Sequence, residues 1–298
     1  MSAAAPALVL AAEPSPIIDT HTHFYDPTRP EGVPWPGKDD KVLYRPVLPD
    51  EFKKLVKPHG VTGTVVVEAS PWPKDNDWLL ELATKNPVIV GIVGRLFPGK
   101  ERFGDSLQTF RASPVFRGIR IGADELKAGL TNDGFRKDIG RFADAELTLD
   151  INGSTTMLAD VAKLAKDFPR LRIVVNHMAN VVIDGKAPPP ADWVRGIEAV
   201  AKHPAVWCKM SALVEGSRKN DGTAPKEIGF YRPVLDALWN AFGEDRLIFG
   251  SNWPVSDLFA SYATVFRLAD SYTTAKGKSA REKVLGTNAV KAYGLKLR

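Results

Sequence analysis

The chain has 298 residues, 44% of them hydrophobic, and a formal net charge of +5 at pH 7. Its one cysteine, Cys208, excludes an intramolecular disulfide and favours a reducing, cytoplasmic compartment. The length exceeds the usual size of one domain but fits a single (β/α)8 barrel, and the hydrophobic content suffices for one large core.

The first fifteen residues, rich in alanine and proline, are expected to form a tail before one folded domain at residues 16–298. Their apolar stretch is too short to span a bilayer and lacks the positively charged start of a secretory signal. A degenerate export signal stays open as a second interpretation. No later segment has the length and apolar character of a membrane span.

Apolar runs rich in β-branched residues alternate with helical patterns along the chain, which is typical of parallel βα units. Eight strands are predicted, at Ile17–Thr22, Gly63–Val67, Val88–Val93, Gly118–Ile121, Leu147–Asp150, Arg172–Val175, Val206–Lys209 and Arg246–Phe249. Helices are predicted between them, among others at Trp78–Lys85, Phe135–Phe142, Thr155–Phe168, Ala191–Lys202 and Tyr231–Phe242. This number of strands, without a glycine-rich dinucleotide motif, predicts a (β/α)8 TIM barrel rather than an open sheet.

Polar side chains stand at or next to the carboxyl end of every predicted strand. His21 and His23 end the first strand with i, i+2 spacing, so both point to the same side and make half of a divalent metal site. The other strands contribute Glu68, Arg95, Arg120, Asn152, His177, Lys209 and Asn252 in chain order. All carboxyl ends of a barrel meet at one mouth, where catalysis occurs, so these groups are expected to converge. A structural ion pair between Glu68 and Arg95 is an equally open interpretation of those two.

The remaining histidines and the cysteine are expected to be structural. His59 and His203 precede strands and therefore belong at the opposite, amino-terminal face of the barrel. Cys208 neighbours Lys209 on a strand, so it points toward the helices if Lys209 points into the barrel.

The segments after strands are long, as in Phe24–Pro49, Met178–Pro190 and Ala212–Gly229, and long loops in a compact domain are usually functional. The first of them carries Tyr25, Trp35, Tyr44 and Arg45, which would suit a lid over an aromatic or sugar-like substrate, although an ordinary surface excursion stays open. The basic residues near the C-terminus are interpreted as a solvated helix face, so no nucleic-acid partner is expected. The mild positive charge is compatible with a small anionic substrate.

A set of motifs in a fixed order extends from residue 17 to residue 295. They are IIDTHTHFYDP, VVVEAS with WLLELA, FRGIRI, IVVNHMAN, VWCKMSAL, FGEDRLIFGSNWPVSD and TNAVKAYGL. In this order they resemble the amidohydrolase superfamily, in its amidohydrolase 2 branch, and within it the lactonases of sugar acids and of 2-pyrone-4,6-dicarboxylate.

The resemblance implies a distorted (β/α)8 barrel of the metal-dependent-hydrolase type that opens a small lactone, the cyclic ester of a sugar acid or dicarboxylate. His21, His23 and His177 become the expected catalytic and metal-binding residues, with zinc as the expected divalent ion. Arg120, Lys209, Glu68 and Trp253 become the expected substrate-binding residues. Since some members of the subgroup work without a metal, a metal-free mechanism stays open, as does a homo-oligomeric state.

One position departs from the family pattern. The eighth strand normally supplies an aspartate that takes a proton from the attacking water, and here Asn252 stands in its place. A carboxamide oxygen cannot accept a proton usefully at neutral pH. Asn252 is still expected among the catalytic residues. Asp26, Glu68 and Asp257 are the candidate replacements for the base, with Asp257 expected in the following helix.

Two other functions compete with lactone hydrolysis. A non-oxidative decarboxylase of the same superfamily would use the same histidines on an unsaturated or aromatic acid. A barrel that binds a sugar or acid without turning it over would follow if the change to Asn252 has removed the base. A nucleophilic serine or cysteine enzyme is disfavoured, because the chain has no Gly-x-Ser-x-Gly motif and Cys208 is expected to be buried.

Overall fold

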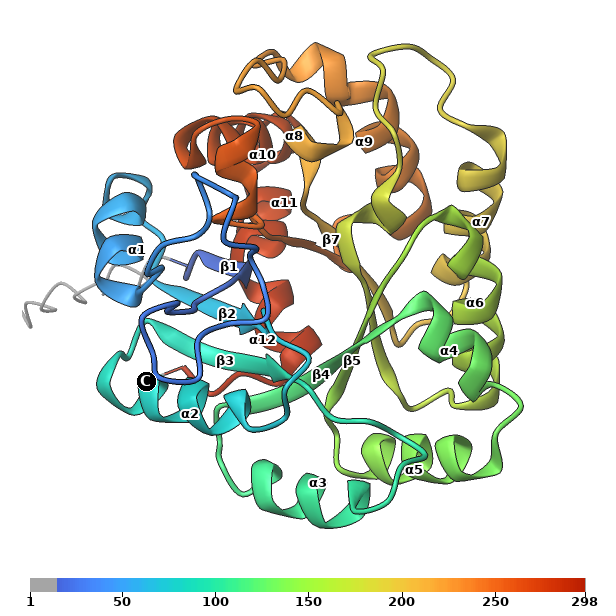
Figure 1. The fold of residues 1–298 in the computed structure, drawn as a ribbon. Coiled ribbons are helices and arrows are strands. Elements are labelled where there is room, and N and C mark those ends of the chain that lie inside the picture. The colour runs from blue at the N-terminus through green and yellow to red at the C-terminus, as the bar shows by residue number, and fades with distance from the viewer. Residues whose placement is uncertain (1–14, 298) are drawn as a thin grey trace, which may run out of the picture.

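Eight parallel strands form one sheet in the computed structural model, which describes residues 15–297. The strands are β1 (Ile18–Thr22), β2 (Gly63–Val67), β3 (Ile89–Gly94), β4 (Phe116–Gly122), β5 (Thr148–Asn152), β6 (Arg172–Val175), β7 (Val206–Met210) and β8 (Leu247–Phe249). Each strand pairs with the next in chain order, and the helices surround the strands (Figure 1). The predicted (β/α)8 barrel is therefore confirmed.

The helices are α1 (Pro49–Val56), α2 (Asp75–Lys85), α3 (Phe103–Arg111), α4 (Ala123–Gly129), α5 (Asp133–Asp144), α6 (Leu158–Asp167), α7 (Ala191–Ala201), α8 (Leu213–Gly216), α9 (Ile228–Phe242), α10 (Tyr262–Lys276), α11 (Lys278–Glu282) and α12 (Asn288–Tyr293). Shorter helical turns are η1 (Lys57–His59), η2 (Thr155–Met157), η3 (Asn176–Asn180), η4 (Val255–Leu258) and η5 (Lys283–Thr287). Among the described residues, no helix combines the length and the apolar character that crossing a membrane requires.

The barrel closes between β1 and the segment that follows β8. The amide of Asn252 donates to the carbonyl oxygen of His21 at 2.8 Å, and the amide of His23 donates to that of Trp253 at 2.9 Å. Gly250 permits this approach, because a Cβ atom there would lie 2.8 Å from Cβ of His21. The closure thus holds both histidines of β1 next to Asn252.

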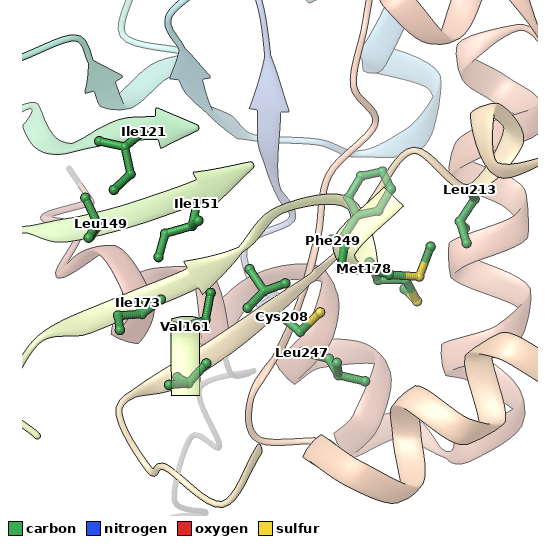
Figure 2. Close-up of a cluster of buried hydrophobic side chains, with 14 of the residues drawn as sticks. Ile121, Leu149, Ile151, Val161, Ile173, Met178, Cys208, Leu213, Leu247 and Phe249 are labelled. Atoms are coloured by element: carbon green, nitrogen blue, oxygen red, sulfur yellow. The ribbon is translucent and has the colours of Figure 1, made fainter. Parts of the chain in front are cut away.

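Side chains of each strand alternate between the barrel interior and the layer beneath the helices. In β2, Val65 and Val67 belong to the interior cluster, whereas Val66 belongs to the outer one. Cys208 lies in the outer cluster close to Leu247, as Figure 2 shows, and is fully buried. Its expected orientation toward the helices agrees with this position.

Helix α12 closes the interior at the amino-terminal ends of the strands. Its Ala292 carbonyl accepts from Thr148 Oγ1, at the first residue of β5, and its Asn288 amide donates to the Leu247 carbonyl, at the first residue of β8. Tyr293 belongs to the interior cluster, and in Figure 1 the helix lies among the strands rather than in the outer ring. The last helix is therefore part of the barrel core.

The predicted limits of β2 and β6 agree with the structure, and those of the other strands differ by one or two residues at one or both ends. Strand ends depend on ladder hydrogen bonds, which a side-chain pattern does not encode. The helix predicted at Thr155–Phe168 begins with the separate turn η2. The expected N-terminal tail lies outside the described residues, except for Ser15.

Candidate active site

Three buried imidazole rings gather at the carboxyl ends of the strands. His21 and His23 come from the end of β1 and its extension, and His177 follows β6 in η3. The ring centroid of His21 lies 5.0 Å from that of His23 and 4.3 Å from that of His177. The fold therefore brings together three residues that are widely separated in the sequence.

His177 sits in a left-handed turn. His177, Met178, Ala179 and Asn180 all have φ between 49° and 57°, a region that non-glycine residues seldom adopt. Burial holds the turn in place, and the indole Nε1 of Trp193 donates to the carbonyl oxygen of Met178 at 2.7 Å. Such strained backbone is tolerated mainly at functional sites, because surrounding structure must stabilise it.

The other two histidines lie elsewhere. The ring of His59 in η1 packs against Tyr262 and Phe266, with centroids at 5.8 and 4.9 Å. The backbone carbonyl of His203 accepts from the guanidinium of Arg246. Both residues precede a strand, so they occupy the face opposite the imidazole cluster.

Hydrogen bonds orient the three clustered rings. Nδ1 of His23 donates to the carbonyl oxygen of Val67 at 2.9 Å, and Nδ1 of His177 lies 2.8 Å from Oγ of Ser211. Nδ1 of His21 lies 3.1 Å from Nζ of Lys209. Nε2 of His21 is buried and has no hydrogen-bond partner among the described residues. Histidines that bind metals commonly donate one ring N–H and leave the other nitrogen for the ion, and His23 follows this pattern. Nδ1 of His21 instead accepts from the Lys209 ammonium, which leaves the ring proton on Nε2.

The surroundings keep the three rings neutral. Burial lowers the pKa of His23 to about 3, and the nearby Arg120 guanidinium adds to the effect. Burial and the Lys209 ammonium hold the pKa of His21 and of His177 well below the usual histidine value. A neutral imidazole is the form that binds a metal ion.

The donor chemistry of the cluster fits a divalent cation, since buried neutral imidazoles are common ligands of an ion such as Zn²⁺. Within residues 15–297, however, no three His, Cys, Asp or Glu side chains are arranged as a ready metal-ligand group. The rings supply the right atoms, and binding an ion would require them to adjust.

Lys209 is fully buried inside the barrel, not at an open surface. Its Nζ lies 2.7 Å from Oδ2 of Asp150, which is also fully buried, and the Tyr293 hydroxyl donates to the same carboxylate at 3.1 Å. Its partners in the structure are Asp150 and His21, and its contact with substrate stays a prediction. Asp150 is not among the predicted site residues, although it ends the predicted strand Leu147–Asp150 and a carboxylate at a strand end is the same kind of signal as the others.

Arg120 and Glu68 lie at the mouth and pair with each other. Arg120 Nε donates to Glu68 Oε1, and its Nη2 donates to the Glu68 carbonyl, both at 2.9 Å. The open possibility of a Glu68–Arg95 pair is wrong, because Arg95 binds Glu125 at 2.6 Å. Arg120, Arg95, Glu68 and Asn152 line a cavity of about 290 Å³.

Asn252 bonds a carboxylate that the sequence analysis did not select. Its backbone is left-handed, with φ of 63°, and its Nδ2 donates to Oε1 of Glu215 at 2.8 Å. Glu215 lies in α8, and burial raises the pKa of its carboxyl to about 7. An acidic residue directly after the apolar pair Leu213–Val214 is the one sequence signal that could have indicated it.

Three other candidates occupy supporting positions. Trp253 has an exposed fraction of 1% and packs against Phe24 and Phe52, and its contact with substrate stays a prediction. Asp257 lies in η4, the short helical turn that follows β8. Asp26 accepts from the amide and hydroxyl of Thr28 in the first long loop.

The first long loop lies over the cluster. Tyr25 and Val47 tie its two ends together by a pair of backbone hydrogen bonds. The Trp35 ring lies 5.9 Å from that of His23 and 5.5 Å from that of Tyr25. The loop therefore places an indole next to the imidazoles.

A sequence profile of the family described as "Amidohydrolase" matches residues 18–295. A protein of Burkholderia ambifaria named L-fucono-1,5-lactonase is 29% identical over 93% of this chain and 94% of its own. An amidohydrolase of Burkholderia multivorans, solved with bound zinc, has a TM-score of 0.85 and 26% identity, covering 94% of this chain and 100% of its own. A Pseudomonas putida structure described as a putative 2-pyrone-4,6-dicarboxylic acid hydrolase has a TM-score of 0.75 and 21% identity, covering 96% and 100% of the two chains.

Proposed function

The chain belongs to the amidohydrolase family, and from this premise we propose that it is a hydrolase that opens a small lactone, the cyclic ester of a sugar acid. The observation that carries the proposal is the buried cluster of His21, His23 and His177 at the carboxyl ends of the strands. The similarity to an L-fucono-1,5-lactonase along nearly the whole chain supports this substrate class. A reducing cytoplasmic location stays a prediction from the single cysteine.

The three histidines would hold a divalent metal ion, and zinc is a common ion at sites built from imidazole nitrogens. Such an ion polarises an ester carbonyl and makes water a better nucleophile at neutral pH. The zinc-bound relative from Burkholderia multivorans supports this assignment. Hydrogen bonds at Nδ1 orient both rings: His23 bonds the Val67 carbonyl oxygen, and His177 bonds the Ser211 hydroxyl.

The remaining residues position the substrate and the rings. Arg120 donates to Glu68 through Nε and Nη2, and these two hydrogen bonds fix its guanidinium at the cavity. Its third nitrogen, Nη1, can then bind a substrate oxygen. Lys209 orients His21 from within the barrel. Trp35 offers an aromatic face beside His23, a surface on which sugar rings pack.

Proton release tests the reaction, because opening a lactone at neutral pH produces a carboxylic acid. Purified protein is mixed with L-fucono-1,5-lactone and other 1,5-sugar lactones in weak buffer with a pH indicator, and the spontaneous rate is subtracted. We expect catalysed proton release that His177→Asn lowers at least 100-fold, whereas the exposed Glu198→Gln leaves it unchanged.

Two outcomes would contradict the proposal. Release of CO₂ from unsaturated or aromatic acids, without proton release from lactones, would identify a decarboxylase. A lactone or sugar acid that raises the melting temperature without any product would identify a binding protein. Elemental analysis tests the metal separately: we expect near-stoichiometric divalent metal that His23→Ala removes.

A further inference from the structure

The proposed hydrolysis needs a group that accepts a proton from water as water attacks the lactone carbonyl. Asn252 stands where the family pattern has an aspartate, and its carboxamide has no useful basicity. The base must therefore be another residue near the imidazole cluster.

The other buried carboxylates near the cluster already have a hydrogen-bond or ion-pair partner. Asp150 accepts from Lys209 and Tyr293, and Glu68 accepts from Arg120. Asp19 accepts from the amide of Ser251 with one oxygen and from the hydroxyl of Tyr262 with the other. Moving a proton onto any of these groups would break a buried hydrogen bond or ion pair.

Glu215 differs from them. Its Oε1 accepts from Asn252 Nδ2 at 2.8 Å, while its Oε2 is buried and has no hydrogen-bond partner among the described residues. A buried carboxylate oxygen without a donor is costly unless a water or substrate binds it. The backbone conformation of Ala212 places the Glu215 carboxylate next to Asn252. Ala212 has φ of 51° and turns the chain from β7 into α8.

We propose that Glu215 is the proton acceptor of the hydrolysis and that Asn252 holds its carboxylate at the position of the missing aspartate. This inference rests on the proposed lactonase function. The water oxygen bonds to the lactone carbonyl carbon while its proton passes to Oε2 of Glu215. The ring C–O bond then breaks, and the proton passes from Glu215 to the released hydroxyl oxygen, so the products are one hydroxy acid and the regenerated carboxylate.

The charges around Glu215 suit this role. The pKa of the Glu215 carboxyl is raised to about 7. Burial raises the pKa most, the hydrogen bond from Asn252 lowers it, and the carboxylate of Asp257 in η4 raises it by a smaller amount. Tyr231 of α9 also faces Glu215, and burial keeps its own pKa far above neutral, so it stays uncharged. A base is most effective when its pKa lies near the working pH.

The test compares Glu215→Gln, Glu215→Asp and the exposed control Glu198→Gln in the lactone assay, with L-fucono-1,5-lactone as the probe. Glutamine keeps the shape and can still accept the Asn252 hydrogen bond, so the fold and the metal content should match wild type. We expect Glu215→Gln to lower kcat about 100-fold or more with KM changed less than about threefold. Glu215→Asp should recover at least a tenth of the wild-type kcat.

The pH profile separates a proton acceptor from a structural residue. In wild type we expect kcat/KM to rise with pH through about 7, as the carboxylate forms, and Glu215→Gln should lose this rise. An active wild type whose Glu215→Gln variant keeps its kcat and its pH profile would overturn the role of Glu215 alone. A wild type that opens no lactone would overturn the proposed function, and the role of Glu215 with it.

Discussion

Lys209 and Asp150 form a fully buried ion pair inside the barrel, with 2.7 Å between Nζ and Oδ2. The two residues come from β7 and β5, and the same Nζ lies 3.1 Å from Nδ1 of His21. Burial lowers the pKa of Lys209 and raises that of Asp150, and each charge offsets the shift of the other. The pair therefore links the packing of the barrel interior to the orientation of one candidate ligand.

Removing one partner of this pair should destabilise the protein strongly. Asp150→Asn would leave the Lys209 ammonium buried without its counter-charge, and we expect the free energy of unfolding in urea to fall by about 3–5 kcal/mol. Tyr293→Phe is the matched control, since it keeps the ion pair and removes one hydrogen bond, which costs about 1 kcal/mol. Equal losses in the two variants would contradict this view of the pair.

Ser211 should matter for metal binding although it touches no metal. Its hydroxyl orients His177, and loss of such a supporting hydrogen bond lowers metal affinity about 10- to 100-fold. We expect Ser211→Ala to give up its metal to a chelator at correspondingly lower concentration than wild type. The exposed Ser279→Ala serves as control. An unchanged chelator titration would show that His177 needs no support from Ser211.

Arg120 should act on substrate binding more than on turnover. Arg120→Met removes the guanidinium at the cavity, and losing one charged hydrogen bond of about 1.5–3 kcal/mol raises KM about 10- to 100-fold. Steady-state kinetics with the lactone probe measure this directly, with the exposed Arg195→Met as control. If kcat falls and KM stays constant, Arg120 does not bind the ground-state substrate.

Asp257 should make stability depend on pH. Burial raises its pKa in the folded protein from 3.8 to about 6, so between these values the folded state holds a proton that the unfolded state has lost. Stability therefore falls as pH rises through this range. Relative to wild type, Asp257→Asn should gain stability from pH 4 to pH 7, because asparagine stays neutral. Urea unfolding of both proteins across this range measures the difference, and a difference independent of pH would contradict the shift.

The sequence was sufficient to predict the barrel and the grouping of His21, His23 and His177, because strand direction alone determines which end of each strand faces the mouth. The pairs that side chains form with one another were harder to predict from the sequence. Arg95 and Glu68 end neighbouring strands, yet Arg95 reaches Glu125 in α4 and Arg120 takes Glu68. Strand order does not specify which rotamers reach which partner.

Glu215 could not be identified from its position in the sequence. It lies beyond the end of β7 in a helix of four residues, and its partner Asn252 is 37 positions away. The left-handed residues Ala212 and Asn252 bring the two side chains together, and neither is a glycine that would have marked the turn.

The hydrogen bonds that close the barrel also constrain the order in which the protein can mature during synthesis. The amide of Ser251 bonds Asp19, 232 positions earlier, beside the bond from Asn252 to His21. A ribosome exposes the two histidines of β1 long before it makes their closing partners. Until then the nascent chain carries the histidine pair without the pocket around it, so a partly synthesised chain cannot acquire the activity in stages.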